Sequence, residues 1–230
     1  MALDLSTLPD VSNLSVGILG GTGDQGRGLA YRFARAGLQV RIGSRSADRG
    51  KSAAEELAAL PRVADGLLTG GDNVYACGAD VAIVAIPWDG HGELVASLRP
   101  YLAGKVVVDC VNPLGFDKQG PYPLTVAEGS AAQQAAALLP ESTVCAAFHH
   151  VSAVLLVDPQ VGRIDLDVLV LGEDREAVAL VQALAGRIDG MRGVYAGRLR
   201  NAGQVEALTA NLIAINRRYK SHAGIRLTDV

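Results

Sequence analysis

The feature that most constrains this chain is a glycine-rich turn, LGGTGDQG, between an apolar segment and a helical one. Gly21, Gly23 and Gly26 match the spacing G-x-G-x-x-G directly after the expected strand 14–20 and directly before the expected helix 26–36. Glycines here allow a tight turn and a close backbone approach to a ligand. Free N–H groups and the dipole at the helix start favour an anion, so the turn predicts a pyrophosphate site. The plainer alternative is a turn that only joins a strand to a helix.

Short apolar segments alternate with helical segments along the chain. Strands that are apolar on both faces and separated by helices of this kind indicate a parallel sheet covered on two sides. The pattern therefore predicts an α/β fold with a doubly wound parallel sheet of the Rossmann type, and a smaller, mainly helical C-terminal part. The expected strands are 14–20, 39–44, 81–87, 105–110, 143–147 and 166–171, and the expected helices are 26–36, 49–60, 92–98, 130–139, 201–219 and one capped by Asp174.

Three regions follow from this pattern. Residues 1–12 have no sustained period and are expected to form a flexible lead-in. Residues 13–155 are expected to form the dinucleotide-binding domain, and residues 156–230 a smaller domain. The Gly and Pro content of GFDKQGPYPL, at 115–124, predicts an irregular surface loop.

The charge balance and the cysteines exclude several classes of protein. The 230 residues carry 21 Lys and Arg against 24 Asp and Glu, a net charge of -3, so we expect no nucleic-acid partner and no membrane attraction. Three scattered cysteines favour a reducing compartment. The N-terminus does not resemble a secretory signal, and apolar runs fall short of the ~18 residues that span a bilayer. We expect a soluble, cytoplasmic protein.

The end of the second expected strand indicates which dinucleotide binds. A site for NAD places Asp or Glu there to bind the ribose hydroxyls, whereas this chain has Gly43, Ser44 and Arg45. A hydroxyl and the guanidinium groups of Arg45 and Arg49 suit a 2′-phosphate, so the sequence predicts NADP. The alternative is that both arginines are solvated surface charges.

Candidate ring-binding residues follow the later strands. Ile86, Pro87 and Trp88 come at the carboxyl edge after one strand and Asn112 after the next, where doubly wound proteins bind ligands. Trp88 could pack on a flat ring, although a lone tryptophan is equally often a packing residue. Of His149 and His150, at most one is expected to face the site, because adjacent residues of an extended segment point oppositely.

Side-chain chemistry is otherwise sparse. Tyr101 and Lys105 match Y-x-x-x-K, but Gly104 interrupts the helix that such a pair needs, and we reject the match. No hydrolytic triad, phosphate-transfer loop or metal-binding pattern is present, so we expect no metal site. Hydride transfer between two stacked ring cofactors needs little acid or base chemistry and fits this pattern.

The C-terminal segment is locally basic, which could draw in a second polyanionic ligand, although a solvated helix end or a dimer contact explains it as well. Glu206 is the single acid before Asp229, against the following basic residues: Arg198, Arg200, Arg217, Arg218, Lys220 and Arg226.

With these residues in view, the chain resembles the NADP oxidoreductases of the reduced deazaflavin coenzyme F-420 (F420). Four blocks carry the resemblance: LGGTGDQGRGLA with GSR, then AIPW, then AAFHHVSA, then LRNAGQVEALTANLIAINRRYKSHAGIRL. The resemblance implies reversible hydride transfer between deazaflavin C5 and nicotinamide C4, with the deazaflavin in a cavity closed by the C-terminal part, and a homodimer. It implies pyrophosphate contacts from Thr22, Gly23, Asp24 and Gln25, 2′-phosphate contacts from Ser44, Arg45 and Arg49, and ring contacts from Ile86, Pro87, Trp88, Asn112 and Ala153, with His149 as a further cofactor-binding candidate.

Two other functions stay open from the residues alone. One is an NADP-dependent reductase of an imine, ketone or chelated iron, which would need a proton donor such as a histidine. The other is a non-catalytic NADPH-sensing protein that uses its basic C-terminal helix to bind a partner.

Overall fold

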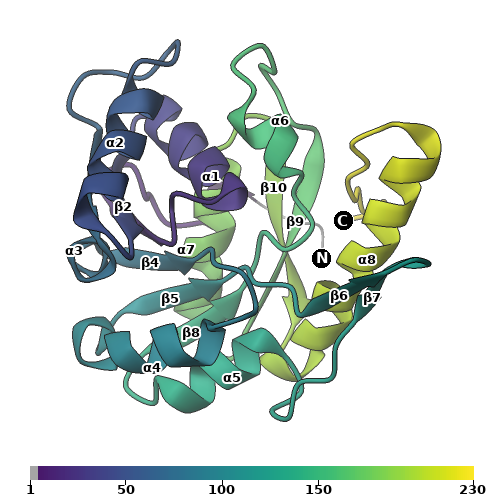
Figure 1. Cartoon of the computed structure of the whole chain (residues 1–230). Coiled ribbons are helices and arrows are strands. Elements are labelled where there is room, and N and C mark those ends of the chain that lie inside the picture. The colour runs from purple at the N-terminus through teal and green to yellow at the C-terminus, as the bar shows by residue number, and fades with distance from the viewer. Residues whose placement is uncertain (1–4) are drawn as a thin grey trace.

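Strand β1 (Ser15–Leu19) lies between β2 (Gln39–Ser44) and β4 (Val81–Val84), and both neighbours run parallel to it. This arrangement belongs to a computed structural model, which describes residues 5–230 (Figure 1). Successive strand residues point to opposite faces. Val16 and Ile18 therefore join one apolar cluster, and Leu19 joins a second cluster on the other face.

The sheet contains eight strands in the order β10-β9-β8-β5-β4-β1-β2-β3. From β3 to β8 all neighbours are parallel, in the order that doubly wound dinucleotide-binding folds use. The predicted α/β fold with a doubly wound sheet is therefore confirmed. The remaining strands are β3 (Leu68–Asp72), β5 (Val106–Asp109), β8 (Thr143–Ala146), β9 (Leu166–Gly172) and β10 (Met191–Gly197).

One pair departs from the parallel pattern. The C-terminal ends of β8 and β9 pair antiparallel, Cys145 with Gly172 and Ala146 with Leu171. The chain passes beyond the carboxyl edge of the sheet after β8, and β9 runs back toward that edge. The pairing of β10 with β9 is parallel again. The sheet thus continues across the boundary expected between residues 155 and 156.

Helices cover both faces of the sheet. The cluster that contains Val16 and Ile18 packs under α1 (Asp24–Arg35), α2 (Ala47–Ala58) and α7 (Arg175–Gly186). The cluster that contains Leu19 packs under α3 (Asn73–Cys77), α4 (His91–Leu102), α5 (Ala131–Leu138) and α8 (Ala202–Tyr219). None of the helices in residues 5–230 is both long enough and apolar enough to span a membrane.

The prediction of an irregular loop at 115–124 is wrong. This segment forms a hairpin of β6 (Leu114–Asp117) and β7 (Gly120–Pro123), and α8 packs against β7 (Figure 1). The Asp117 carboxylate accepts hydrogen bonds from the backbone N–H groups of Gln119 and Gly120, and Gly120 takes a φ of 123°. Asp and Gly therefore act here as hairpin-turn residues.

Six elements besides the hairpin escaped the sequence prediction. They are β3, α3, β10, the five-residue helix α6 (Ala153–Val157) and two 3-10 turns, η1 (Leu5–Thr7) and η2 (Leu199–Asn201). Residues 1–4 of the expected lead-in lie outside the described residues, whereas Val11 is buried in the core. The structure also gives no support to the rejected Tyr101–Lys105 match, because the Lys105 ammonium donates a hydrogen bond to the Ala79 carbonyl at 2.7 Å.

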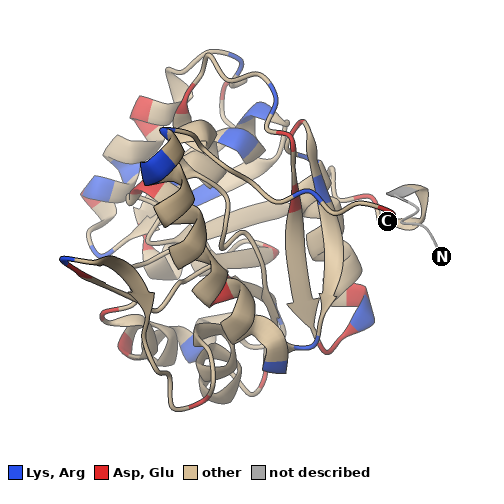
Figure 2. Cartoon of the chain, turned by 90° about the vertical axis from the view of Figure 1, so that its right-hand side faces the viewer, with Lys and Arg blue, Asp and Glu red and all other residues tan. Residues whose placement is uncertain are grey.

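The basic residues of the C-terminal segment divide into two groups. The ribbon at the C-terminal end of α8 carries the Lys and Arg colour (Figure 2), and Arg217, Arg218 and Lys220 there, like Arg200, are exposed and have no ion-pair partner among residues 5–230. Arg198 instead pairs with Glu173, and Arg226 pairs with Asp167 of β9.

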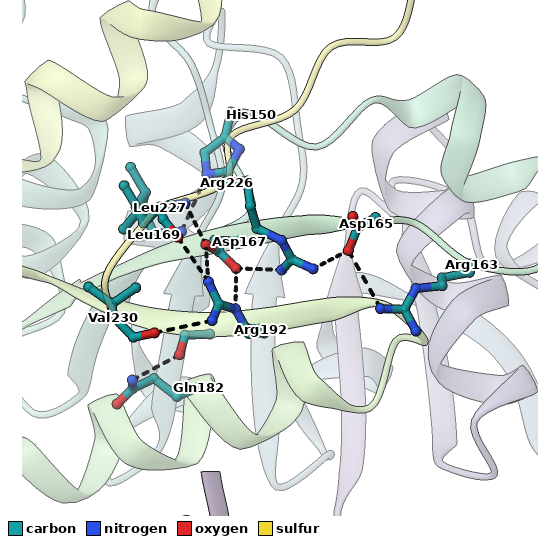
Figure 3. Close-up of polar contacts among 11 residues, drawn as sticks. His150, Arg163, Asp165, Asp167, Leu169, Gln182, Arg192, Arg226, Leu227 and Val230 are labelled. Atoms are coloured by element: carbon teal, nitrogen blue, oxygen red, sulfur yellow. Dashed lines mark hydrogen bonds and ion pairs between the residues drawn. The ribbon is translucent and has the colours of Figure 1, made fainter. Parts of the chain in front are cut away.

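A buried carboxylate anchors the C-terminal tail to β9. Asp167 is fully buried and accepts hydrogen bonds from the guanidinium groups of Arg192 and Arg226 and from the Leu227 N–H, each at 2.7 Å (Figure 3). Burial alone would raise the pKa of Asp167, but these donors lower it to about 2. The Asp167 N–H also donates to the Ile225 carbonyl, so the tail covers the part of β9 that β8 leaves unpaired.

We expect Asp167→Asn to lower the free energy of unfolding by about 2–4 kcal/mol, because two arginines lose their shared anionic acceptor. Urea denaturation at pH 7 measures the loss. Exposed Asp65 provides the matched Asp65→Asn control, which should change stability by less than about 0.5 kcal/mol. Equal effects of both substitutions would show that the tail contributes no such stabilisation.

Candidate functional site

The three predicted glycines have different tasks. A Cβ atom on Gly26 would lie 2.6 Å from the Gly21 Cα, and one on Gly21 would lie 2.9 Å from Ile42. These two glycines therefore allow β1, α1 and β2 to pack closely. A Cβ atom on Gly23, which caps α1, would lie 3.6 Å from its nearest neighbour, the Gly20 carbonyl oxygen. Gly23 is not required by the packing of the chain and leaves open space where an anion can approach the helix.

One cavity opens beside this turn, and we name it the glycine-turn cavity. It has a volume of about 610 Å³ and lies between the ends of β1, β2 and β4. Predicted residues from three separate segments meet in it, namely Thr22, Gly23, Ser44, Arg45, Arg49, Ile86 and Pro87.

The end of β2 gives this cavity a cationic side. Ser44 is buried, and its hydroxyl accepts only a long 3.4 Å hydrogen bond, from the Ser46 N–H. Arg45 and Arg49 are exposed, and no acid among residues 5–230 lies within 4 Å of either guanidinium. Two unpaired guanidinium groups beside a hydroxyl suit a bound phosphate group.

Asn73 is a cavity residue that the sequence analysis missed. It is the first residue of α3 and buried, and its Oδ1 accepts a 3.1 Å hydrogen bond from the Gly20 N–H. The amide group thereby fixes the start of the glycine turn from the side of β2 and α3. No motif marks it, because α3 is only five residues long and follows the glycine-rich strand β3.

A second cavity adjoins the first, and we name it the hairpin cavity. It measures about 440 Å³ and shares Gly23, Ala85, Ile86, Pro87 and Asp89 with the glycine-turn cavity. Its other walls come from the glycine turn, the ends of β4, β5 and β8, the β6–β7 hairpin and α8, through Asp24, Gln25, Trp88, Cys110, Val111, Asn112, Leu114, Phe116, His149, Thr209 and Ile213.

His149 lies in this cavity with its imidazole unpartnered. The Asn112 side-chain amide and the Thr209 hydroxyl both donate to the His149 carbonyl, at 2.8 and 3.1 Å, and hold its backbone. Only 3% of the residue is exposed, and both ring nitrogens are buried without a hydrogen-bond partner among residues 5–230. Burial lowers the pKa of His149 to about 4, so at neutral pH the ring is uncharged.

His150 points elsewhere. Its Nε2 accepts a hydrogen bond from the Leu169 N–H on β9 (Figure 3), and burial lowers its pKa to about 4. Only His149 lines the cavity, but the reason differs from the expected one: the two histidines lie in a turn after Phe148, whose φ is 65°, and not in an extended segment. Cys110 also lines the cavity, but burial raises the pKa of its thiol, which donates to the Val84 carbonyl.

Trp88 lines the hairpin cavity and stacks on His91, with ring centroids 5.4 Å apart and an interplanar angle of 26°. His91 also belongs to a polar cluster with Asp109, Gln134 and Glu206. His91 contacts Asp109 at 2.7 Å and Gln134 at 2.9 Å, and nearby Glu206 of α8 accepts hydrogen bonds from the Ala131 and Ala132 N–H groups at the start of α5. The single acid that the sequence analysis found among the basic residues of the C-terminal segment is thus a buried helix cap.

Three of the predicted residues lie outside both cavities. Gly21 and Gly26 pack within the turn, and Ala153 begins α6, where its carbonyl oxygen lies 3.5 Å from a Cβ atom built on Gly28 of α1. Conversely, the α8 and hairpin residues of the second cavity carry no motif. The helical period of α8 predicts which residues face the core, but it does not predict which would line a cavity.

The strand order, the glycine turn and the open cavity at its helix start define a Rossmann-type dinucleotide-binding protein. The sequence profile described as "NADP oxidoreductase coenzyme F420-dependent" matches residues 15–113. An F420-dependent NADP reductase of Methanothermobacter marburgensis is 37% identical over 94% of this chain and 99% of its own length. Another, of Methanocaldococcus jannaschii, is 36% identical over 94% and 99%. The chain belongs to the family of F420-dependent NADP reductases.

The fold agrees with a solved structure of similar extent. A candidate F420-dependent NADP reductase from Arthrobacter sp. FB24 superposes with a TM-score of 0.78 at 26% identity, covering 94% of this chain and all of that one. The similarity therefore extends over nearly the whole of both chains.

The buried carboxyl of Glu206 predicts a pH-dependent stability. Burial raises the pKa of Glu206 from 4.5 to about 7, so its favourable contribution is present below pH 4.5 and is lost as the pH rises through 7. We expect the stability of Glu206→Gln, relative to the unmodified protein, to improve between pH 5 and pH 8, by at most about 1.4 kcal/mol per pH unit. Thermal or urea unfolding across this range measures it. Exposed Glu55 supplies the Glu55→Gln control, and parallel stability curves for Glu206→Gln and the unmodified protein would contradict the assignment.

Proposed function

We propose that this chain transfers a hydride reversibly between reduced coenzyme F420 and NADP, with NADP in the glycine-turn cavity and the deazaflavin in the hairpin cavity. The observation that carries the proposal is the common wall of the two cavities at Ile86 and Pro87. Bound there, the two cofactors supply all the redox chemistry, through deazaflavin C5 and nicotinamide C4. The protein needs to bring these atoms to about 3–3.5 Å and exclude water.

The glycine-turn cavity fits NADP at both of its anionic groups. Thr22, Gly23, Asp24 and Gln25 surround the start of α1, where free N–H groups would hold the pyrophosphate. Ser44, Arg45 and Arg49 would hold the 2′-phosphate, and no carboxylate follows β2 directly to repel it.

The hairpin cavity fits a planar ring with polar edges. Ile86, Pro87, Trp88 and Asn112 would border the stacked rings, with His149 as a further residue beside them. Ala153, which the family resemblance also places beside the rings, lies outside the cavity and stays a prediction.

Arg49→Ala and Arg45→Ala should each weaken NADP binding about tenfold to a hundredfold, since a charge-assisted hydrogen bond contributes about 1.5–3 kcal/mol. Binding of NAD, which lacks the 2′-phosphate, should change less than about twofold. Isothermal titration calorimetry at fixed salt compares the two ligands. Arg99, exposed on α4 and paired with Glu141, gives the matched Arg99→Ala control. Equal losses for NADP and NAD would rule out a 2′-phosphate contact.

The direct test mixes purified protein with NADPH and oxidised F420 and follows the deazaflavin absorbance. We expect the absorbance to fall only when both are present, and to recover with excess NADP. Unchanged absorbance at saturating concentrations would exclude the proposed reaction. Turnover of an imine, ketone or chelated iron without F420 would favour the alternative reductase, and tight NADPH binding without any acceptor would favour a sensor.

We further propose a cytoplasmic homodimer in which residues 13–155 bind NADP and residues 156–230 close the deazaflavin cavity. Exposed apolar side chains on α8 and the hairpin, Phe116, Tyr122, Ile215 and Tyr219, support a contact between copies. Thr209 and Ile213 support the closing role of α8, because they line the hairpin cavity.

A further inference from the structure

The wall formed by Trp88 depends on a residue that touches neither cavity. After β4 the chain turns through Gly90, whose φ is 87°, and the His91 N–H donates to the Trp88 carbonyl at 3.0 Å. This turn places the His91 imidazole against the indole, and the imidazole itself is completely shielded from solvent. Trp88 is therefore supported from behind by a buried heterocycle.

The hydrogen bonds of His91 determine its charge. Its Nε2 contacts the Asp109 carboxylate at 2.7 Å and its Nδ1 contacts Gln134 Oε1 at 2.9 Å. The Gln134 amide cannot be reversed without loss, because its nitrogen donates to the Glu128 carboxylate at 3.2 Å. Carboxylate and amide oxygens only accept, so both ring nitrogens of His91 must donate. An imidazole with two N–H groups is an imidazolium.

The surroundings support this charge. Burial alone would lower the pKa of His91, but the hydrogen bonds and the charge of Asp109 raise it above its ordinary value, with a further contribution from Glu206. Two acids act on the ring, Asp109 from β5 and Glu206 from α8, and Glu128 contacts only the Gln134 amide. Asp109 is itself held in place by the Val111 N–H at 3.0 Å.

A cation over the face of an indole is attracted to the π-electrons of the ring. We propose that His91 is a positioning residue, held as an imidazolium by Asp109 and Gln134, which fixes the Trp88 indole at the wall of the hairpin cavity. This assignment rests on the proposed function, since it gives the fixed indole a purpose in aligning the deazaflavin. His91 acts only through Trp88 and makes no contact with the reacting rings.

A double-mutant cycle tests whether His91 acts through Trp88. We expect His91→Gln to slow single-turnover hydride transfer about tenfold while NADP affinity changes less than about twofold, since only the ring alignment is disturbed. In a Trp88→Phe background the same substitution should slow transfer less than about twofold. The exposed His222 gives the His222→Gln control, which should leave the rate unchanged. Equal losses in both backgrounds, or no loss at all, would overturn the proposal.

The charge of His91 is tested without any turnover. The chain has four histidines, so in ¹⁵N-histidine-labelled protein the ring signals that disappear in His91→Gln identify His91. At pH 7 we expect both of its nitrogens to be protonated, and a single protonated nitrogen would overturn the imidazolium. Trp88 is the only tryptophan, and its emission should brighten in Asp109→Asn, because a protonated imidazole in contact quenches indole fluorescence.

Should His91→Gln fail to fold, Gln134→Leu removes the Nδ1 acceptor and leaves the Asp109 pair intact. It should slow hydride transfer about threefold in the Trp88 background and not in Trp88→Phe. Absence of F420 turnover in the unmodified enzyme would defeat the proposed function, whereas the labelling and fluorescence results would still decide the charge of His91 and its contact with the indole.

Discussion

The site depends on the parallel hydrogen bonding of β1 to both β2 and β4. Parallel pairing brings the carboxyl ends of these strands to one edge of the sheet, although their loops are separated by tens of residues in sequence. The glycine turn, the Ser44–Arg45 segment and the Ile86–Trp88 segment meet there for that reason. Because the next strand, β5, is also parallel, Asn112 arrives at the same edge, and two cavities form on either side of Pro87.

The buried charged side chains of Asp167, Asp109 and Arg32 each have hydrogen-bond partners. Asp167 anchors the tail with two arginines, and Asp109 pairs with His91. The Arg32 side chain of α1, almost completely buried, donates to four backbone carbonyls between Leu155 and Val161 and so fixes the segment around α6. An unpaired buried charge would destabilise the fold, so these contacts hold the tail on β9, α4 on β5 and the α6 segment on α1. Next to the hairpin cavity, α8 has a polar anchor of its own, because Glu206 accepts hydrogen bonds from the Ala131 and Ala132 N–H groups of α5.

Local signals predicted most of the sheet and the cofactor-phosphate side of the site. Long apolar strands, helices with a clear period and the glycine spacing depend on neighbouring residues, and the structure contains them at the expected positions. The hairpin at 114–123 was missed because its strands are short and rich in Gly and Pro, and its stability comes from packing on α8. Asn73, Thr209 and the His91 cluster were missed because their roles depend on partners far away in sequence. Glu206 has its partners 74 and 75 residues away.

The two cavities use different physical means to hold what they bind. The glycine-turn cavity offers two unpaired guanidinium groups and a helix N-terminus, so charge selects its ligand. The hairpin cavity is lined by no Lys or Arg of residues 5–230, and its histidine is neutral because burial lowers its pKa to about 4. Burial also keeps the Cys110 thiol in this cavity protonated, because it raises the pKa of the thiol. Among residues 5–230 the charged side chains that line this cavity are the acids Asp24 and Asp89, so it offers no cation to a ligand and would orient a planar ring through shape and hydrogen bonds. The single positive charge that we assign close by, on His91, lies behind the indole of Trp88, where it can hold the wall without competing for the hydride.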